Sequence, residues 1–221
     1  MDTDLRLSWD TKAALKIGLF SRGGSNRIPT DASDHDFAPD AVLFPVGILV
    51  PQLQELWLYF VDTKATADCL VDVLGLFWEA NRHRFPLVQR LVLNQDNGPE
   101  NNSRRTQFMH RMVEFADRAQ LDIGLAYYPP YHSKYNPVER CWGVLENHWR
   151  GEVLDTVQAA LAFARDMTWC GNNPVVRLIT TVYEKGRSIA KKAMTLLEAT
   201  RLKRDAKLGR WFVDIIHQPE T

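Results

Sequence analysis

Hydrophobic and polar positions alternate along the first part of the chain with the two-residue period of a half-buried strand. This alternation covers residues 5–19 and predicts a strand or one arm of a hairpin there. Two apolar runs follow, at residues 41–50 and 56–61, and a turn containing Pro51 joins them. These runs predict an antiparallel pair, so the N-terminal part is expected to form a meander of three strands.

Apolar residues then recur with helical spacing. Residues 66–82 are predicted to form a helix with Thr66 as its N-cap, and residues 104–120 a second, amphipathic helix. Strands are predicted at residues 88–93 and 123–128. The remaining elements are expected to be helices at residues 137–149 and 156–167, a basic helical region to about residue 207, and a last strand at 210–216.

This order of elements predicts the fold class. Early strands joined by short turns favour antiparallel pairing, and later strands that alternate with helices favour parallel additions to the same sheet. We expect an α/β protein with the ribonuclease-H-like fold: a mixed five-stranded sheet, three strands antiparallel and two parallel, flanked by helices. The domain prediction is a core at residues 1–152 and a C-terminal helical extension at residues 153–221 packed on it.

Composition is that of a globular protein, with 45% hydrophobic residues. No apolar run approaches the roughly 18 residues of a membrane helix, and the polar N-terminus does not resemble a signal peptide, so a soluble cytoplasmic protein without membrane contact is expected. The three cysteines form no CxxC pair and are interpreted as buried thiols. Net charge is zero, but acidic residues dominate the first 70 positions and basic ones residues 177–210. That asymmetry is compatible with a nucleic-acid partner or with a solvated helix face.

Three acids are candidates for chemistry. Asp96 follows a predicted buried strand and precedes Asn97-Gly98, a place where open α/β sheets bind ligands, although turn capping would also explain it. Glu139 lies at a helix start formed by Asn136 and Pro137, where capping alone would also account for it. Asp10 stands inside a strand, where acids are rare, and solvent exposure is its alternative interpretation.

The surroundings of these acids resemble a known family. Residues 128–142 read YPPYHSKYNPVERCW and resemble the signature around the last acid of DDE-type insertion-sequence transposases of the bacterial branch related to mariner-like elements. Residues 94–102 resemble the region of the second acid, and residues 8–12 with 21–24 that of the first. The likeness runs from about residue 5 to residue 215.

The resemblance implies a DDE catalytic domain that cleaves DNA phosphodiester bonds and transfers strands. Asp10, Asp96 and Glu139 would be the catalytic and metal-binding acids, holding two Mg²⁺ ions for which Mn²⁺ can substitute. Asp10 would bridge both ions, and the other two acids would each complete one. One ion would activate water and later a DNA 3′-hydroxyl, and the other would stabilise the leaving oxygen.

The expected partner is double-stranded DNA, at the transposon ends and at the target, with a homodimer as a further expectation. The phosphate-binding candidates are basic residues near the acids, although solvated side chains are the alternative: Arg104, Arg105, Lys134 and Arg140. Relatives carry a helix-turn-helix DNA-binding domain before the first acid. Only nine residues precede Asp10 here, so that domain is expected to be absent, and a truncated copy is one interpretation.

Two other functions remain open. One is a different ribonuclease-H-like nuclease, such as a resolvase or an RNA-cleaving enzyme. The other is a noncatalytic remnant or nucleic-acid-binding module whose acids are structural. Convergence of the carboxylates of Asp10, Asp96 and Glu139 separates catalysis from the noncatalytic alternative, because bound metals require it.

Overall fold

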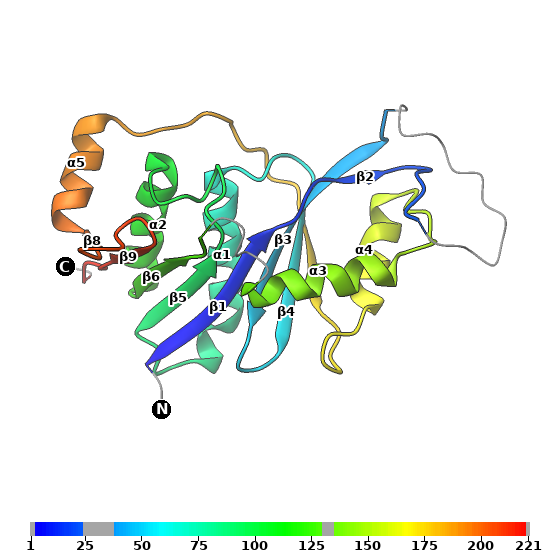
Figure 1. Ribbon diagram of the computed structural model, residues 1–221, viewed down its shortest axis with the longest axis horizontal. Coiled ribbons are helices and arrows are strands. Elements are labelled where there is room, and N and C mark those ends of the chain that lie inside the picture. The colour runs from blue at the N-terminus through cyan, green and yellow to red at the C-terminus, as the bar shows by residue number, and fades with distance from the viewer. Residues whose placement is uncertain (1–2, 24–37, 130–134, 220–221) are drawn as a thin grey trace. The chain divides into compact units, whose positions relative to one another are not determined.

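The computed structural model describes residues 3–23, 38–129 and 135–219 (Figure 1). The chain forms two compact units. Unit 1 comprises Met1–Trp9, Ala65–Asn136 and Tyr183–Thr221, and unit 2 comprises Asp10–Lys64 and Pro137–Val182. The chain therefore passes between the units several times, and each unit is assembled from segments that are distant in sequence.

Unit 1 contains a mixed sheet with the strand order β1-β5-β6-β9-β8. Its strands are β1 (Asp4–Thr11, of which the part through Trp9 belongs here), β5 (Arg90–Gln95), β6 (Asp122–Tyr127), β9 (Phe212–Ile215) and β8 (Leu202–Arg204). β1, β5 and β6 run parallel, whereas β9 is antiparallel to both β6 and β8. The parallel strands end together, so Asp96, directly after β5, follows the carboxyl end of this sheet.

The helices of unit 1 are α1 (Ala67–Asn81), the short 3₁₀ helix η1 (Arg82–Arg84), α2 (Thr106–Ala119) and α5 (Lys191–Thr200). The Thr66 side chain accepts a hydrogen bond from the Cys69 amide at 3.4 Å, which confirms the predicted N-cap of α1. α1 and α2 pack against each other through apolar faces that include the fully buried Phe77 and Phe108.

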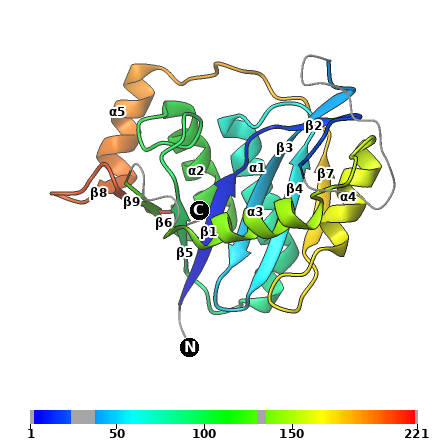
Figure 2. The ribbon, with the colours of Figure 1, turned by 45° about the vertical axis from the view of Figure 1, so that its right-hand side comes forward.

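Unit 2 contains the antiparallel hairpin of β3 (Ala41–Val50) and β4 (Glu55–Val61), with β2 (Leu15–Ile17) beside β3 and β7 (Val175–Ile179) parallel to β4. The end of β1 joins it, because the Lys12 amide donates to the Pro45 carbonyl at 2.9 Å. Helices α3 (Pro137–His148) and α4 (Val157–Asp166) cover this sheet (Figure 2). The predicted apolar stripe of α3 is buried in the core of the unit: Val138, Trp142, Leu145 and Trp149.

The structure confirms the mixed α/β class and most predicted elements, and it adds strands. The described residues form nine strands rather than five, and the predicted basic helical region contains β7 before the helix α5 and β8 after it. The helix of residues 157–166 ends at Met167, whose backbone is extended, and a tight turn at residues 169–172 follows, after which the β-branched pair Val175-Val176 favours a strand. Positive charge on residues 177–210 does not distinguish a helix from a strand, which is why the predicted helix there is wrong in part. No helix in the described part of the chain is long and apolar enough to cross a membrane.

A partly buried ion pair fixes the C-terminal segment of unit 1. The Arg201 side chain is 7% exposed. Its guanidinium group contacts Asp117 twice: Nη1 donates to Oδ2 at 3.1 Å, and Nη2 pairs with Oδ1. Its Nε donates to the Ile216 carbonyl at 2.8 Å. Asp117 lies near the end of α2, so this pair ties α2 to β9 and to the residue that ends α5.

Asp117→Ala is therefore expected to destabilise the protein by about 2 kcal/mol, because it leaves the Arg201 charge buried without its partner. The expected loss of stability is smaller than for a fully buried ion pair, because the Asp117 side chain is 36% exposed and solvent partly screens its charge. Urea unfolding measures it, and Asp166→Ala on the exposed end of α4 is the control, with an expected change within about 0.5 kcal/mol. Equal urea midpoints for Asp117→Ala and Asp166→Ala would contradict a stabilising role of the Asp117–Arg201 pair.

The cysteines differ in their surroundings. Cys69 and Cys141 are buried, and burial raises the pKa of each thiol to about 12. Cys170 is exposed, so the expectation that all three are buried is wrong for this residue. It lies in a tight turn between Trp169 and Asn172 with a positive φ of 47°, and connecting segments of this kind run over the protein surface.

We expect a thiol reagent at pH 8 to modify one cysteine in the folded protein and three in urea. The buried thiols remain protonated at that pH and are inaccessible, whereas the thiolate is the reactive form. The measurement is a count of reacted thiols, with Cys170→Ser as the variant that should reduce the folded count to none. Rapid reaction of all three in the folded protein would contradict the burial of Cys69 and Cys141.

Candidate active site

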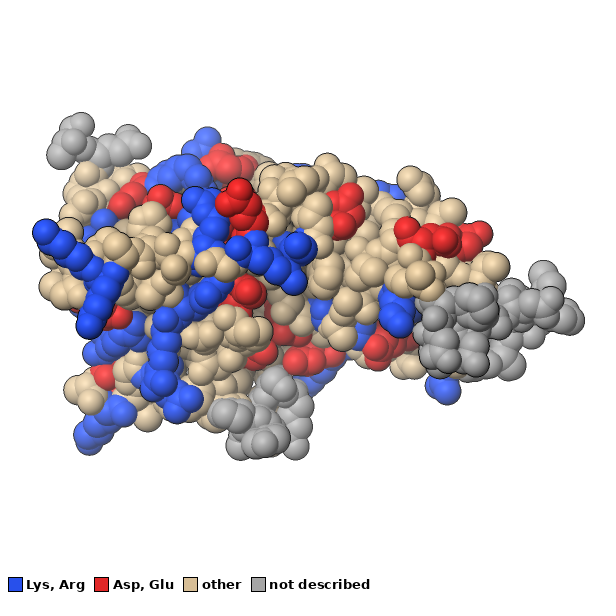
Figure 3. Space-filling view, turned by 90° about the horizontal axis from the view of Figure 1, so that it is seen from above, with Lys and Arg blue, Asp and Glu red and all other residues tan. Residues whose placement is uncertain are grey.

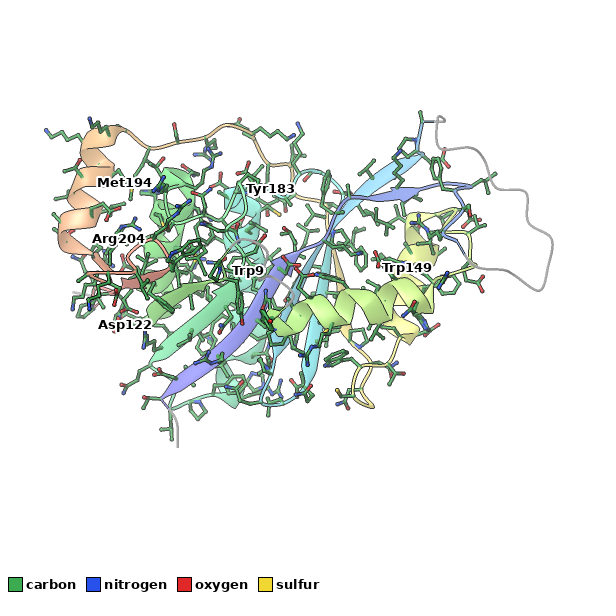
Figure 4. The ribbon with its side chains drawn as sticks, in the orientation of Figure 1. Trp9, Asp122, Trp149, Tyr183, Met194 and Arg204 are labelled. Carbon is green, nitrogen blue, oxygen red and sulfur yellow. The ribbon has the colours of Figure 1, made fainter. Side chains whose placement is uncertain are left out.

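The start of α3 is tied to β1 by the Asn136 side chain. Asn136 is fully buried, its Oδ1 accepts a hydrogen bond from Ser8 Oγ, and its Nδ2 donates to the Trp9 carbonyl at 3.0 Å. The sequence predicts a helix cap at Asn136, within the segment that resembles the family signature. The structure shows that both ends of its amide also hold the residues that lead directly into Asp10 (Figure 4, where Trp9 is labelled).

Asp10 is buried rather than solvent-facing, with 6% of its surface exposed. The indole Nε1 of Trp142 on α3 donates to its Oδ2 at 2.7 Å. Two residues further along the chain, Lys12 forms an ion pair with Glu146 on the same helix. The exposed alternative for Asp10 is thereby excluded, and its carboxylate has a fixed orientation toward α3.

Glu139 is half-buried in the first turn of α3. It lies three residues before Trp142, and residues three and four apart share one face of a helix. Glu139, Trp142 and Glu146 therefore lie along one face of α3, the face that contacts the end of β1. Through Trp142, Asp10 thus contacts the face of α3 that also carries Glu139, within unit 2.

A glycine on β3 makes room for this arrangement. A Cβ atom added to Gly47 would lie 2.8 Å from ring atoms of Trp142 and 3.0 Å from the Val138 side chain. Only glycine fits there without displacing the indole that donates to Asp10. Gly47 and Trp142 were not among the functional residues found from sequence, because this contact joins positions 95 residues apart.

Asp96 belongs to unit 1 and is ordered by its own loop. Asn101 Nδ2 donates to Gln95 Oε1 at 3.0 Å, to the Asp96 carbonyl at 3.2 Å and to Asp96 Oδ1 at 3.4 Å. The Tyr127 hydroxyl in turn donates to the Asn101 carbonyl at 2.8 Å. Burial raises the pKa of Tyr127, nearby Arg204 opposes this shift, and the charge of Asp96 adds to it. Tyr127 therefore remains a neutral donor that supports the loop.

The donors near the acids are hard oxygens of the kind Mg²⁺ prefers. Directly after Asp96, the side-chain oxygen of Asn97 is buried and has no hydrogen-bond partner among the described residues, so it is one more hard oxygen beside Asp96. Residues 3–23, 38–129 and 135–219 contain no group of three or more His, Cys, Asp or Glu side chains placed to hold a metal ion. Asp10 and Glu139 belong to unit 2 and Asp96 to unit 1, so two of the three acids lie in one unit.

The predicted phosphate-binding residues have different environments. Arg104 is exposed beside the Asp96 loop, and Arg140 is exposed on α3 next to Glu139. Arg105 pairs with Glu100 at 3.3 Å, so its charge is already compensated. Lys134 lies outside the described residues.

Comparisons with known proteins give one family and two solved structures. The family described as "Rhodopirellula transposase DDE domain" matches residues 2–217. The fold is similar to that of "Mos1 transposase paired-end complex with left transposon end", with a TM-score of 0.50 and 10% identity over 70% of this chain and 44% of that one. "Crystal structure of a pre-cleavage Mos1 transpososome" matches with a TM-score of 0.46 and 9% identity over 71% of this chain and 46% of that one.

This chain thus spans less than half the length of the Mos1 chains. The first likeness shows the ribonuclease-H-like fold, a mixed sheet flanked by helices, as the sequence predicted. A comparison with curated protein sequences gives no match.

Proposed function

Since the chain belongs to the family of Rhodopirellula transposase DDE domains, we propose that it cleaves and joins DNA phosphodiester bonds, with Asp10, Asp96 and Glu139 as its catalytic acids. The proposed reaction is the cleavage and strand transfer of insertion-sequence transposition. The proposed substrate is double-stranded DNA at the transposon ends and at the target, bound by a homodimer.

One observation carries this proposal: Asp10 is a buried carboxylate held by Trp142, on the helix whose first turn carries Glu139. A buried carboxylate is costly unless opposite charge or hydrogen bonds compensate it. The indole N–H of Trp142 compensates part of that cost. Cations bound beside Asp10 would add favourable opposite charge, and this gives a physical reason for an acid inside a strand.

Three carboxylates suit two divalent cations. Asp10, Asp96 and Glu139 would hold these ions, and Mn²⁺ would substitute for Mg²⁺. When bound, such a pair lowers the pKa of an attacking water and stabilises the charge on the leaving oxygen. The protein's own residues hold the acids in place: Trp142 fixes the carboxylate of Asp10, and Asn101 fixes that of Asp96.

The test is cleavage of a short labelled duplex that carries the inverted repeats flanking the gene. Purified protein is expected to nick it with Mg²⁺ or Mn²⁺ and to be inactive in EDTA. Asp96→Asn should be inactive with both metals, because it removes a charge and retains the shape of the side chain. Cleavage by Asp96→Asn at the wild-type rate would overturn the assignment of Asp96 as a catalytic acid. DNA binding without cleavage under all metal conditions would instead favour a noncatalytic module.

A further inference from the structure

Unit 1 contains two adjoining pockets beside Asp96. The first has a volume of about 220 Å³ and is lined by Asn97, Asn102, Ser103, Arg104 and Arg210. The second has a volume of about 460 Å³ and is also lined by Ser103, Arg104 and Arg210. We call the two together the Arg104–Arg210 groove. It begins at the residue that follows Asp96 and extends to α5, where Met194 contributes to the lining (Figure 4).

Arg204 lines this groove, but its guanidinium group is already bound by groups of the protein. Its Nε and Nη2 both bind the Glu198 carboxylate, at 2.9 and 2.6 Å. Its Nη2 also donates to the Ser103 carbonyl at 2.8 Å, and its Nη1 to the Gly209 carbonyl at 3.2 Å. Arg204 therefore joins α5, the β8–β9 turn and the loop before α2, and it neutralises the acid of the second pocket.

Arg104 and Arg210 differ from Arg204 in their partners. Both are exposed, and within the described residues neither guanidinium group forms an ion pair. Arg210 lies with its guanidinium carbon 5.2 Å from the centre of the Trp211 ring, and its carbonyl accepts a hydrogen bond from Ser103 Oγ at 3.0 Å. The groove thus presents two positive charges without an ion-pair partner among the described residues, and hydrogen bonds of Arg204 and Ser103 hold its lining in place. Lys and Arg side chains also gather on the face around α5 (Figure 3).

We propose that the Arg104–Arg210 groove binds the phosphate backbone of the DNA strand that leads to the cleavage site. This inference rests on the proposed function, because it takes DNA as the substrate. Guanidinium groups match phosphate oxygens in a bidentate manner, and contacts to phosphates position DNA without reading its sequence. Arg210 was not a candidate from sequence, because only the fold brings the β8–β9 turn next to the Asp96 loop.

Fluorescence anisotropy with a labelled duplex in metal-free buffer tests the groove. Arg104→Gln and Arg210→Gln are each expected to weaken binding about 5- to 10-fold at 0.1 M salt, and each should reduce the slope of log K against log salt by about 1. Arg82→Gln is the control: it removes the same charge from an exposed arginine of unit 1 that pairs with Glu79 and does not line the groove, and it should leave the affinity within about twofold.

The two proposals can fail separately. If Arg104→Gln and Arg210→Gln both bind DNA with the affinity of wild type and of the Arg82→Gln control, the groove assignment is wrong, whatever the cleavage assay shows. If they weaken binding as expected while wild type never cleaves with Mg²⁺ or Mn²⁺, the groove stands and the catalytic function fails. A wild-type protein that does not bind the duplex at low salt overturns the groove assignment as well. Circular dichroism of each variant confirms that it is folded.

Discussion

Replacing Glu139 by glutamine is expected to reduce Mg²⁺-dependent DNA cleavage by about a thousandfold or more. The change removes one negative charge and retains the size of the side chain. A catalytic metal contributes several kcal/mol to the stability of the transition state, and each 1.4 kcal/mol lost corresponds to a tenfold decrease in rate. The measurement is the single-turnover rate of nicking on the short duplex with saturating protein.

The same helix offers a matched control for this prediction. Glu146 also lies on α3, on the same face as Glu139, but it pairs with Lys12 and its side chain is 58% exposed. Glu146→Gln removes an equal charge and should cost less than about 1 kcal/mol of stability, with cleavage retained. Nicking that survives Glu139→Gln, or that is lost equally in Glu146→Gln, would show that the two acids do not differ in function.

The effect of Glu139 on stability should be small by comparison. Glu139→Ala removes an acid from the first turn of α3, where it interacts favourably with the amino end of the helix. We expect a loss of about 1 kcal/mol in urea unfolding, the usual contribution of a group at this end of a helix. Loss of cleavage with so small a loss of stability separates chemistry from folding.

Elements with a strong local pattern could be predicted from sequence. The helical spacing of α1 and α2, the cap at Thr66 and the buried stripe of α3 all depend on residues within a few turns of one another. β7 could not be predicted in the same way, because Val175–Ile179 is short and only half-buried. Its conformation is decided by pairing with β4, more than 100 residues earlier in the chain.

The candidate acids were found by resemblance, and their physical roles depend on contacts that sequence does not display. The pattern around Asp10 left burial and exposure both open, and the bond from Trp142 decides between them across 132 residues of sequence. Asn136 and Pro137 correctly predicted the start of α3. The attachment of Asn136 to β1 required the tertiary structure, because Ser8 and Trp9 lie on a strand more than 120 residues earlier in the chain.

Trp142→Phe is expected to slow cleavage about 10- to 100-fold, the usual effect of removing a group that orients a metal ligand. The variant keeps an aromatic ring in the core and removes the N–H that donates to Asp10. Because a buried carboxylate oxygen then loses the indole N–H as a donor, the protein should also lose about 1–3 kcal/mol of stability. Replacing a residue that only packs would not change how the cleavage rate depends on Mg²⁺. The decisive measurement is therefore the cleavage rate as a function of Mg²⁺ concentration.

We expect the Mg²⁺ midpoint of Trp142→Phe to rise and part of the lost rate to return at high Mg²⁺. Leu145→Ala is the control, because Leu145 is fully buried on the same stripe of α3 and has no polar contact to offer. It should lose about 2–5 kcal/mol of stability, at least as much as Trp142→Phe, while its Mg²⁺ midpoint stays unchanged at a temperature where it remains folded. Equal midpoints for wild type and Trp142→Phe would mean that the indole only packs, and that Asp10 keeps its orientation without it.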